Sequence, residues 1–173
     1  RLSLVGSEMC IRDSNYDWTV KSSEVNISFE VPKNGKKGTI NGLEADIKFN
    51  PLDLLGSKVT AKVDVNSINA NNEGLTSHLL EPDFFDTKQF PFILFESTEI
   101  IMQDSIYTAF GNLTMKGVTH NEKIMFKFQD TDSLGFFSGK LNLFCGDYNL
   151  ISNKVGDSTT LANININVPV FRK

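Results

Sequence analysis

The sequence predicts an all-β fold of antiparallel strands, and three observations lead to this prediction. Apolar and polar residues alternate along most of the chain, with the period of two that is typical of strands with one buried face. Helical periodicity is almost absent. Turn signals such as Lys33-Asn34-Gly35 and Lys116-Gly117 separate the alternating segments. A chain of 173 residues fits one domain.

The first half of the chain contains three clear strands. In the first of them Ile27 and Phe29 alternate with polar neighbours, and the strand ends at Pro32. Pro51 opens a segment, residues 51–56, that is predicted to form a short helical turn. The predicted strands cover residues 25–31, with Trp18 and Val20 just before them, residues 43–49 and residues 59–65.

Residues 69–91 interrupt the alternation. A polar loop with Asn71, Asn72 and Gly74 is followed by an apolar stretch that includes Phe84 and Phe85. Connections of this length without sheet are usually functional or disordered, and the Leu and Phe content argues against disorder. We therefore expect a short helical or loop lid that either plugs one end of the fold or closes over a ligand.

The second half of the chain returns to strands, and Lys116-Gly117 is the expected hairpin turn between two of them. Roughly eight antiparallel strands must stack as a sandwich or close into a barrel, because an open sheet leaves two adhesive edges. The pattern does not choose between these two architectures. The additional strands cover residues 93–97, 107–115, 124–128, 137–143 and 162–168.

The inward positions of these strands are rich in aromatic residues, and the chain has 14 Phe in total. A barrel of eight strands either fills its interior with side chains or encloses one small ligand. The aromatic residues therefore form a filled core or line a binding cavity, and the sequence leaves both open. The predicted inward set contains Phe29, Phe49, Phe95, Tyr107, Phe126, Phe128 and Phe137.

The first fourteen residues, 1–14, do not share the pattern of the remainder. The stretch from Glu8 to Ser14 resembles the translation of a sequencing adapter, and a disordered tail is the alternative. The domain is therefore expected to cover residues 15–173. Without Cys10 the domain retains Cys145 alone, which excludes an intramolecular disulfide and a Cys-x-x-Cys site.

Composition excludes several classes of function. The net charge of −4 provides no basic surplus for a nucleic acid backbone, so we expect no nucleic acid partner. The longest apolar runs are far shorter than the ~20 residues of a membrane-spanning helix, so we expect no stable membrane insertion. Nothing in the sequence fixes the oligomeric state, and a homodimer is compatible with it.

Catalytic and metal-binding motifs are missing from the sequence. The chain has no Gly-x-Ser-x-Gly motif and no glycine-rich phosphate loop after a strand. Neither His78 nor His120 has the His or Cys neighbours of a metal site. We therefore expect no enzyme activity, no metal and no cofactor. His78 is predicted to be a hydrogen-bonded residue at the lid hinge, with contact to a ligand headgroup as the alternative, and His120 a solvated turn residue.

Four stretches of the chain resemble the YceI-like family. They are Trp18-Thr19-Val20 with residues 23–29, Ser67-Ile68-Asn69 followed by His78-Leu79 and Asp83-Phe84-Phe85-Asp86, Phe90-Pro91 with residues 95–98, and residues 111–119. Thr76-Ser77 stand where the family usually has Arg-Asp, and Cys145 stands where it often has Arg. The resemblance runs from about Trp18 to Val170.

The resemblance implies a single lipocalin-like, eight-stranded barrel that binds a polyisoprenoid or similar amphiphilic lipid. It also implies a periplasmic or secreted protein, with a cytoplasmic location as the alternative. The predicted function is non-catalytic binding, storage or transport of the lipid. Two rivals remain: an enzyme acting on an isoprenoid or quinone-like lipid in the same pocket, and a structural module without a ligand.

The predicted lipid contacts lie inside the barrel and at its lid. Tyr107 is expected to offer its hydroxyl to a headgroup or a water molecule. Phe84 is expected to retain the lipid, so that Phe84→Ala weakens retention. The ligand-binding residues are predicted to be Phe29, Phe49, His78, Phe84, Phe85, Phe95, Tyr107, Leu113, Phe126, Phe128 and Phe137.

Overall fold

The computed structural model describes residues 16–150 and 160–173 of the chain. The prediction about residues 1–14 lies outside these residues. Ten strand segments and one short α-helix account for most of the described chain. The strands are β2 (Asp17–Val20), β3 (Asn26–Val31), β4 (Lys36–Ile40), β5 (Leu43–Lys48), β6 (Lys58–Asp64), β7 (Phe92–Gln103), β8 (Ile106–Met115), β9 (Val118–Asp130), β10 (Leu134–Phe144) and β11 (Leu161–Arg172), and the helix is α2 (Glu73–Leu79).

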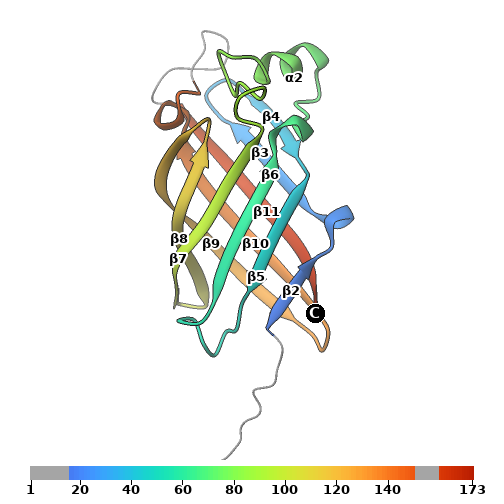
Figure 1. Cartoon of the computed structure of the whole chain (residues 1–173), viewed down its shortest axis with the longest axis vertical. Coiled ribbons are helices and arrows are strands. Elements are labelled where there is room, and N and C mark those ends of the chain that lie inside the picture. Colours follow the sequence, from blue (N-terminus) through green and yellow to red (C-terminus); the bar gives the residue numbers. More distant parts are fainter. Residues whose placement is uncertain (1–15, 151–159) are drawn as a thin grey trace, which may run out of the picture.

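The segments form one closed antiparallel barrel of eight strands, which confirms the predicted fold (Figure 1). β2 and β3 together make the first barrel strand, and β4 and β5 together make the second. β11 pairs with β10 on one side and with β2 and β3 on the other. The last strand therefore closes the sheet and leaves a cylinder where the sequence allowed either a cylinder or two layers.

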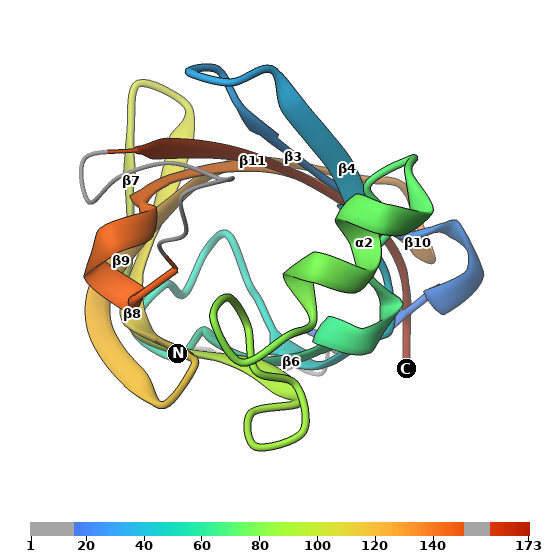
Figure 2. The same ribbon diagram turned by 90° about the horizontal axis from the view of Figure 1, so that it is seen from above.

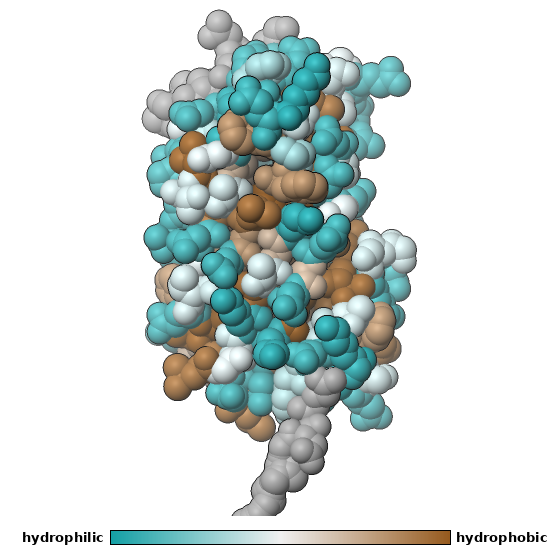
Figure 3. Space-filling model, viewed as in Figure 1, coloured by the Kyte–Doolittle hydropathy of each residue, from teal (hydrophilic) through white to brown (hydrophobic). Residues whose placement is uncertain are grey.

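Alternation along the strands separates the core from the surface as predicted. In β10, Phe137, Leu141 and Leu143 are buried and every second residue is exposed. The outer wall carries cross-strand ion pairs, such as Lys58 Nζ to Glu96 Oε2 at 3.2 Å. Figure 3 shows this outer face as mostly hydrophilic with scattered apolar side chains.

Three local predictions need correction. β4 is a strand that was not predicted from the sequence. Residues 51–56, predicted to form a short helical turn, form hydrogen-bonded turns without a helix, and Asp53 N–H donates to the carbonyl of Asn50 at 2.9 Å. His120 lies within β9 and not in the turn before it. That turn consists of Lys116 and Gly117 with φ of 53° and 73°, the positive values that a two-residue hairpin requires.

The two ends of the barrel differ. α2 and the residues after it lie over part of one opening, and the turn between β3 and β4 projects outward from the wall at the same end (Figures 1 and 2). Asn72 caps α2 by accepting a hydrogen bond from Leu75 N–H at 2.9 Å. No helix within residues 16–150 and 160–173 has the length and apolar composition of a membrane span.

Candidate functional site

A cavity of about 270 Å³ occupies the interior of the barrel. Inward side chains from the strands form its wall, and Leu75 and Leu79 of α2 reach it from one end. Seven of the residues predicted from the sequence line this cavity, so the barrel brings together positions that lie far apart in the chain. They are Phe29, Phe84, Phe85, Phe95, Leu113, Phe126 and Phe137.

An aromatic floor closes the cavity at the end opposite α2. Phe49 is completely buried, and its ring lies 5.1 Å from those of Tyr107 and Phe128, centroid to centroid. The Trp18 indole N–H donates to the carbonyl of Phe49 at 3.0 Å. We define Trp18, Phe49, Tyr107 and Phe128 as the aromatic floor. Edge-to-face contacts of this kind stabilise a packed ring cluster.

Three of the predicted aromatic residues therefore do not line the cavity. Phe49, Tyr107 and Phe128 are absent from the lining, whereas Phe126 and Phe137 belong to it and their rings pack on Phe49 at 5.5 Å and 5.4 Å. Alternation predicts which residues point inward but not how deep they lie along the barrel axis. The interior is therefore filled at one end and hollow at the other.

Aliphatic side chains make up most of the cavity wall, and apart from Leu113 they were not among the predicted site residues. Ile27, Ile47, Val63 and Leu141 are among them. They share the inward parity of the aromatic residues, so the same alternation could have identified them. Lys36 also lines the cavity, and it is the one charged residue among the described lining residues.

Residues 73–90, which we call the lid segment, cover part of the open end (Figure 2). Phe84 and Phe85 are buried and contact each other edge to face at 4.9 Å. Backbone hydrogen bonds hold this loop in place, among them Phe85 N–H to the carbonyl of Leu79 at 3.0 Å. The lid segment thus places two aromatic rings against the cavity, as predicted.

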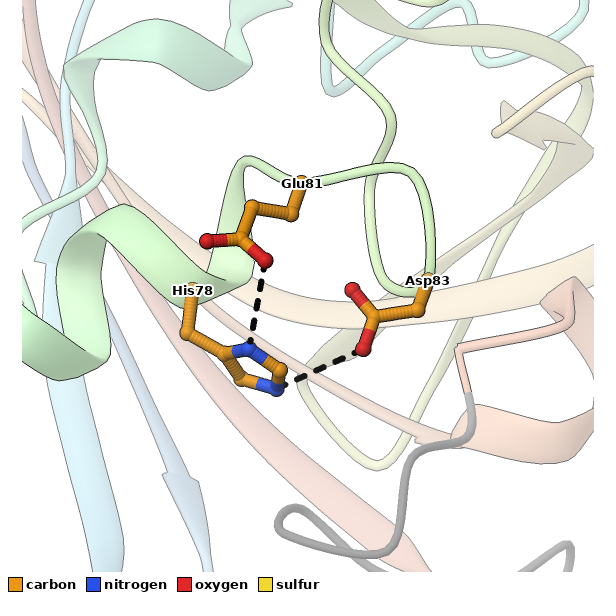
Figure 4. A group of neighbouring side chains, drawn as sticks. All are labelled: His78, Glu81 and Asp83. Carbon is orange, nitrogen blue, oxygen red and sulfur yellow. Dashed lines mark ion pairs between the residues drawn. The ribbon is translucent and has the colours of Figure 1, made fainter.

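His78 occupies the last turn of α2 and does not line the cavity. Its ring is mostly buried, with Nδ1 3.8 Å from Glu81 Oε2 and Nε2 3.9 Å from Asp83 Oδ2 (Figure 4). The ligand atoms of these three side chains lie within 4.8 Å of one another, so the group could hold a metal ion. Motif spacing does not detect such a group, because it forms only when the lid segment folds back on the helix.

A second polar cluster holds the 3₁₀ helix η3 (Cys145–Tyr148) against β9. The Tyr148 hydroxyl donates to Glu122 Oε2 at 2.6 Å, and His120 Nε2 lies 2.7 Å from the carbonyl oxygen of Asp147. Burial, followed by the hydrogen bond to Glu122, raises the pKa of Tyr148 above its usual value. These side chains therefore have a structural role.

Cys145 is the one thiol of the described residues, and it lines the cavity. Burial raises the pKa of this thiol, against a smaller lowering by a backbone hydrogen bond. A buried neutral thiol is a weak nucleophile. Cys145 therefore contributes an apolar surface to the cavity wall.

Comparison with solved structures shows the same fold in several bacterial proteins. BcnA of Burkholderia cenocepacia superposes with a TM-score of 0.79 at 19% identity, covering 89% of this chain and 99% of that one. A YceI protein of Campylobacter jejuni gives 0.68 at 21% identity, with coverages of 80% and 86%. A polyisoprenoid binding domain of Saccharophagus degradans gives 0.67 at 10% identity, with coverages of 90% and 98%.

Individual relatives match less than half of this chain, whereas a family model matches most of it. UPF0312 proteins of Yersinia pestis and Yersinia enterocolitica are 32% identical over 82 residues, which is 47% of this chain. The match spans only 43% of the length of those relatives. Residues 18–170 match the family described as YceI-like domain, and this range includes almost all of the barrel. The chain therefore belongs to the YceI-like domain family.

Proposed function

We propose that this domain binds a long-chain polyisoprenoid or similar amphiphilic lipid inside the barrel and stores or carries it without transforming it. The observation that carries the proposal is the cavity of about 270 Å³ with its wall of aliphatic and aromatic side chains. Membership of the YceI-like family supports it, as does the fold shared with a polyisoprenoid binding domain of Saccharophagus degradans.

Simple energetics favour a long tail. Burying hydrocarbon contributes about 0.8 kcal/mol per methylene, whereas association costs about 4–15 kcal/mol. A tail of about ten carbons therefore barely binds, and a longer one is required. Ligand cavities commonly measure roughly 300–1,000 Å³, so a cavity of about 270 Å³ is small for such a chain. We infer that the lid segment moves outward when the lipid is bound.

The predicted contacts divide into three roles. We propose that the lining residues touch the tail and that the lid segment retains it through Phe84 and Phe85. The aromatic floor, with Phe49, Tyr107 and Phe128, limits how deep the tail enters. His78 holds the lid segment through Glu81 and Asp83. The proposed tail contacts on the barrel wall are Phe29, Phe95, Leu113, Phe126 and Phe137.

An enzyme acting on a lipid in the same pocket is the rival function. It would be favoured by titratable groups that face each other inside the barrel. Among the described lining residues there is no carboxylate and no imidazole. The cavity likewise favours a ligand over a structural module with a filled core. We therefore propose a binding function, and we propose a periplasmic or secreted location from the family relationship.

The test compares lipid carriage in the native protein and in a variant with a filled cavity. Lipids extracted from protein purified from a bacterial host are identified by mass spectrometry. We expect a polyisoprenoid in the native protein and its loss in Ala109→Phe, because Ala109 lines the cavity. Thr108→Phe, one residue away on the outer face of β8, is the matched control and should retain the lipid.

Circular dichroism checks that both variants keep the barrel. A native protein that carries no lipid and does not bind a long-chain polyisoprenol added to it would contradict the proposal. So would a lipid that persists equally in Ala109→Phe.

A further inference from the structure

Lys36 is the starting point for an inference about the headgroup of the ligand, and the inference rests on the proposed function. It is the one charged side chain among the described residues that line the cavity. It begins β4, directly after the turn between β3 and β4. That turn lies at the same end of the barrel as the lid segment (Figures 1 and 2). The charge is therefore placed at the mouth and not in the depth of the cavity.

The pairing of β3 with β4 distinguishes Lys36 from its neighbour. Lys37 is exposed and lies opposite Glu30, so its charge faces a carboxylate on the outer surface. Lys36 is half-buried and lies opposite Val31, which also lines the cavity. Adjacent residues of a strand point to opposite faces. The hairpin thus directs one lysine to the outer surface and the other inward, toward an apolar surface.

The ammonium of Lys36 has no ion-pair partner within residues 16–150 and 160–173. An unpaired charge is costly in an apolar environment, so we expect the methylene chain to cover the cavity rim and the ammonium to reach water at the mouth. Two of the carboxylates of the lid segment, those of Glu81 and Asp83, face His78. An anion at the mouth would supply the partner that the described part of the chain does not provide.

We infer that the bound amphiphile carries an anionic headgroup, such as a phosphate ester, and that Lys36 binds this headgroup at the mouth of the cavity. The tail then extends from the lid segment toward the aromatic floor. A charge-assisted hydrogen bond to an ammonium is stronger than one between neutral groups, so the site prefers the phosphate ester over the alcohol of the same tail. The preference falls with salt because the contact is partly exposed.

The experiment compares two ligands that differ only in the headgroup. Geranylgeranyl phosphate and geranylgeraniol are titrated against protein loaded with the neutral fluorescent probe N-phenyl-1-naphthylamine. We expect the native protein to prefer the phosphate by about three- to tenfold, between the values for an exposed ion pair and a buried one. Lys36→Met keeps the stem, removes the charge and should abolish this preference. Lys37→Met is the matched control and should keep it.

The outcomes separate this inference from the proposed function. If geranylgeraniol and its phosphate bind native protein equally, or if Lys36→Met keeps the preference, the headgroup inference is wrong and lipid binding stands. If neither ligand displaces the probe, the proposed function fails as well. Inorganic phosphate alone should not bind. Saturable phosphate binding that disappears in Lys36→Met would indicate a free-anion site and overturn the headgroup assignment.

Discussion

At the residue scale, Gly38 shows how a missing side chain shapes the site. Thr39 and Asn69 exchange two backbone hydrogen bonds of 2.8 Å, which attach the chain leading to α2 to the edge of β4. A Cβ atom on Gly38 would lie 2.3 Å from the carbonyl oxygen of Asn69 and 2.8 Å from Phe29 Cζ. Only glycine permits this close approach.

Gly38→Ala is therefore expected to destabilise the fold by about 2–3 kcal/mol, because backbone and the Phe29 ring must both move. Thermal unfolding followed by circular dichroism measures the change. Gly74→Ala is the control, since that glycine lies in α2 with only the Asn72 side chain near, at 3.3 Å. Its effect should remain within about 1 kcal/mol. Equal effects of the two substitutions would contradict the close-approach argument.

Tyr148 leads to a prediction about alkaline pH. Burial and Glu122 raise its pKa in the folded protein, whereas an unfolded tyrosine titrates near pH ~10. Its contribution to stability is therefore complete below about pH 10 and is lost as the pH rises further, because only the unfolded chain releases the proton. Urea unfolding at neutral pH and above pH ~10 should show this loss in the native protein and a smaller one in Tyr148→Phe. An equal loss in both would exclude Tyr148 as the cause.

At the scale of elements, alternation predicted most strands because each has one buried face. β4 was not predicted, since Lys36 and Gly38 occupy two of its inward positions and only Ile40 is apolar. Other segments of the chain explain why these two residues are at inward positions. Lys36 lines the cavity, and Gly38 leaves room for the backbone of Asn69 to pack against β4. The same limit applies to His78, whose carboxylate neighbours come together only when the lid segment folds.

Substitution of Phe84 tests whether the lid segment retains the lipid. The Phe84 ring is buried, contacts Phe85 and lines the cavity, so Phe84→Ala should remove apolar contact with the proposed lipid and raise the rate of its release about tenfold. Release of a fluorescent polyisoprenoid into acceptor vesicles measures that rate. Phe92→Ala, at an exposed position on β7, is the control and should release at the native rate. Unchanged release from Phe84→Ala would mean that the lid segment only plugs the barrel.

At the scale of the whole molecule, the choice between sandwich and barrel depends on the pairing of the last described strand with the first ones. Five residue pairs join β11 to β3, from Asn163 with Glu30 to Asn167 with Asn26, and three more join β11 to β2. No residue type marks such a pairing, so periodicity alone left it open, and the family resemblance supplied the barrel. The division of the interior into cavity and aromatic floor was likewise not predictable, because it depends on the depth at which each ring packs.

The aromatic floor predicts an upper limit to tail length. Phe49 packs on four rings and separates the cavity from the far end of the barrel. Phe49→Leu should lengthen the cavity, shift the preference toward longer isoprenoids and lower stability by roughly 1–3 kcal/mol. Competition between isoprenoids of increasing length measures the shift. Phe136→Leu, on the outer face of β10, is the control. If Phe49→Leu kept the native preference for isoprenoid length, as Phe136→Leu should, the aromatic floor would not limit the length of the tail.

The position of β11 has a consequence for synthesis of the protein. This strand comes last in the chain, yet it lies between β10 and the segments β2 and β3. While the ribosome is still making it, both of those neighbours expose unpaired backbone groups that can recruit other nascent chains. The barrel therefore cannot close until β11 has been synthesised. A chaperone that covers the unpaired edges of β10 and of β2 and β3 until then would raise the yield of native protein.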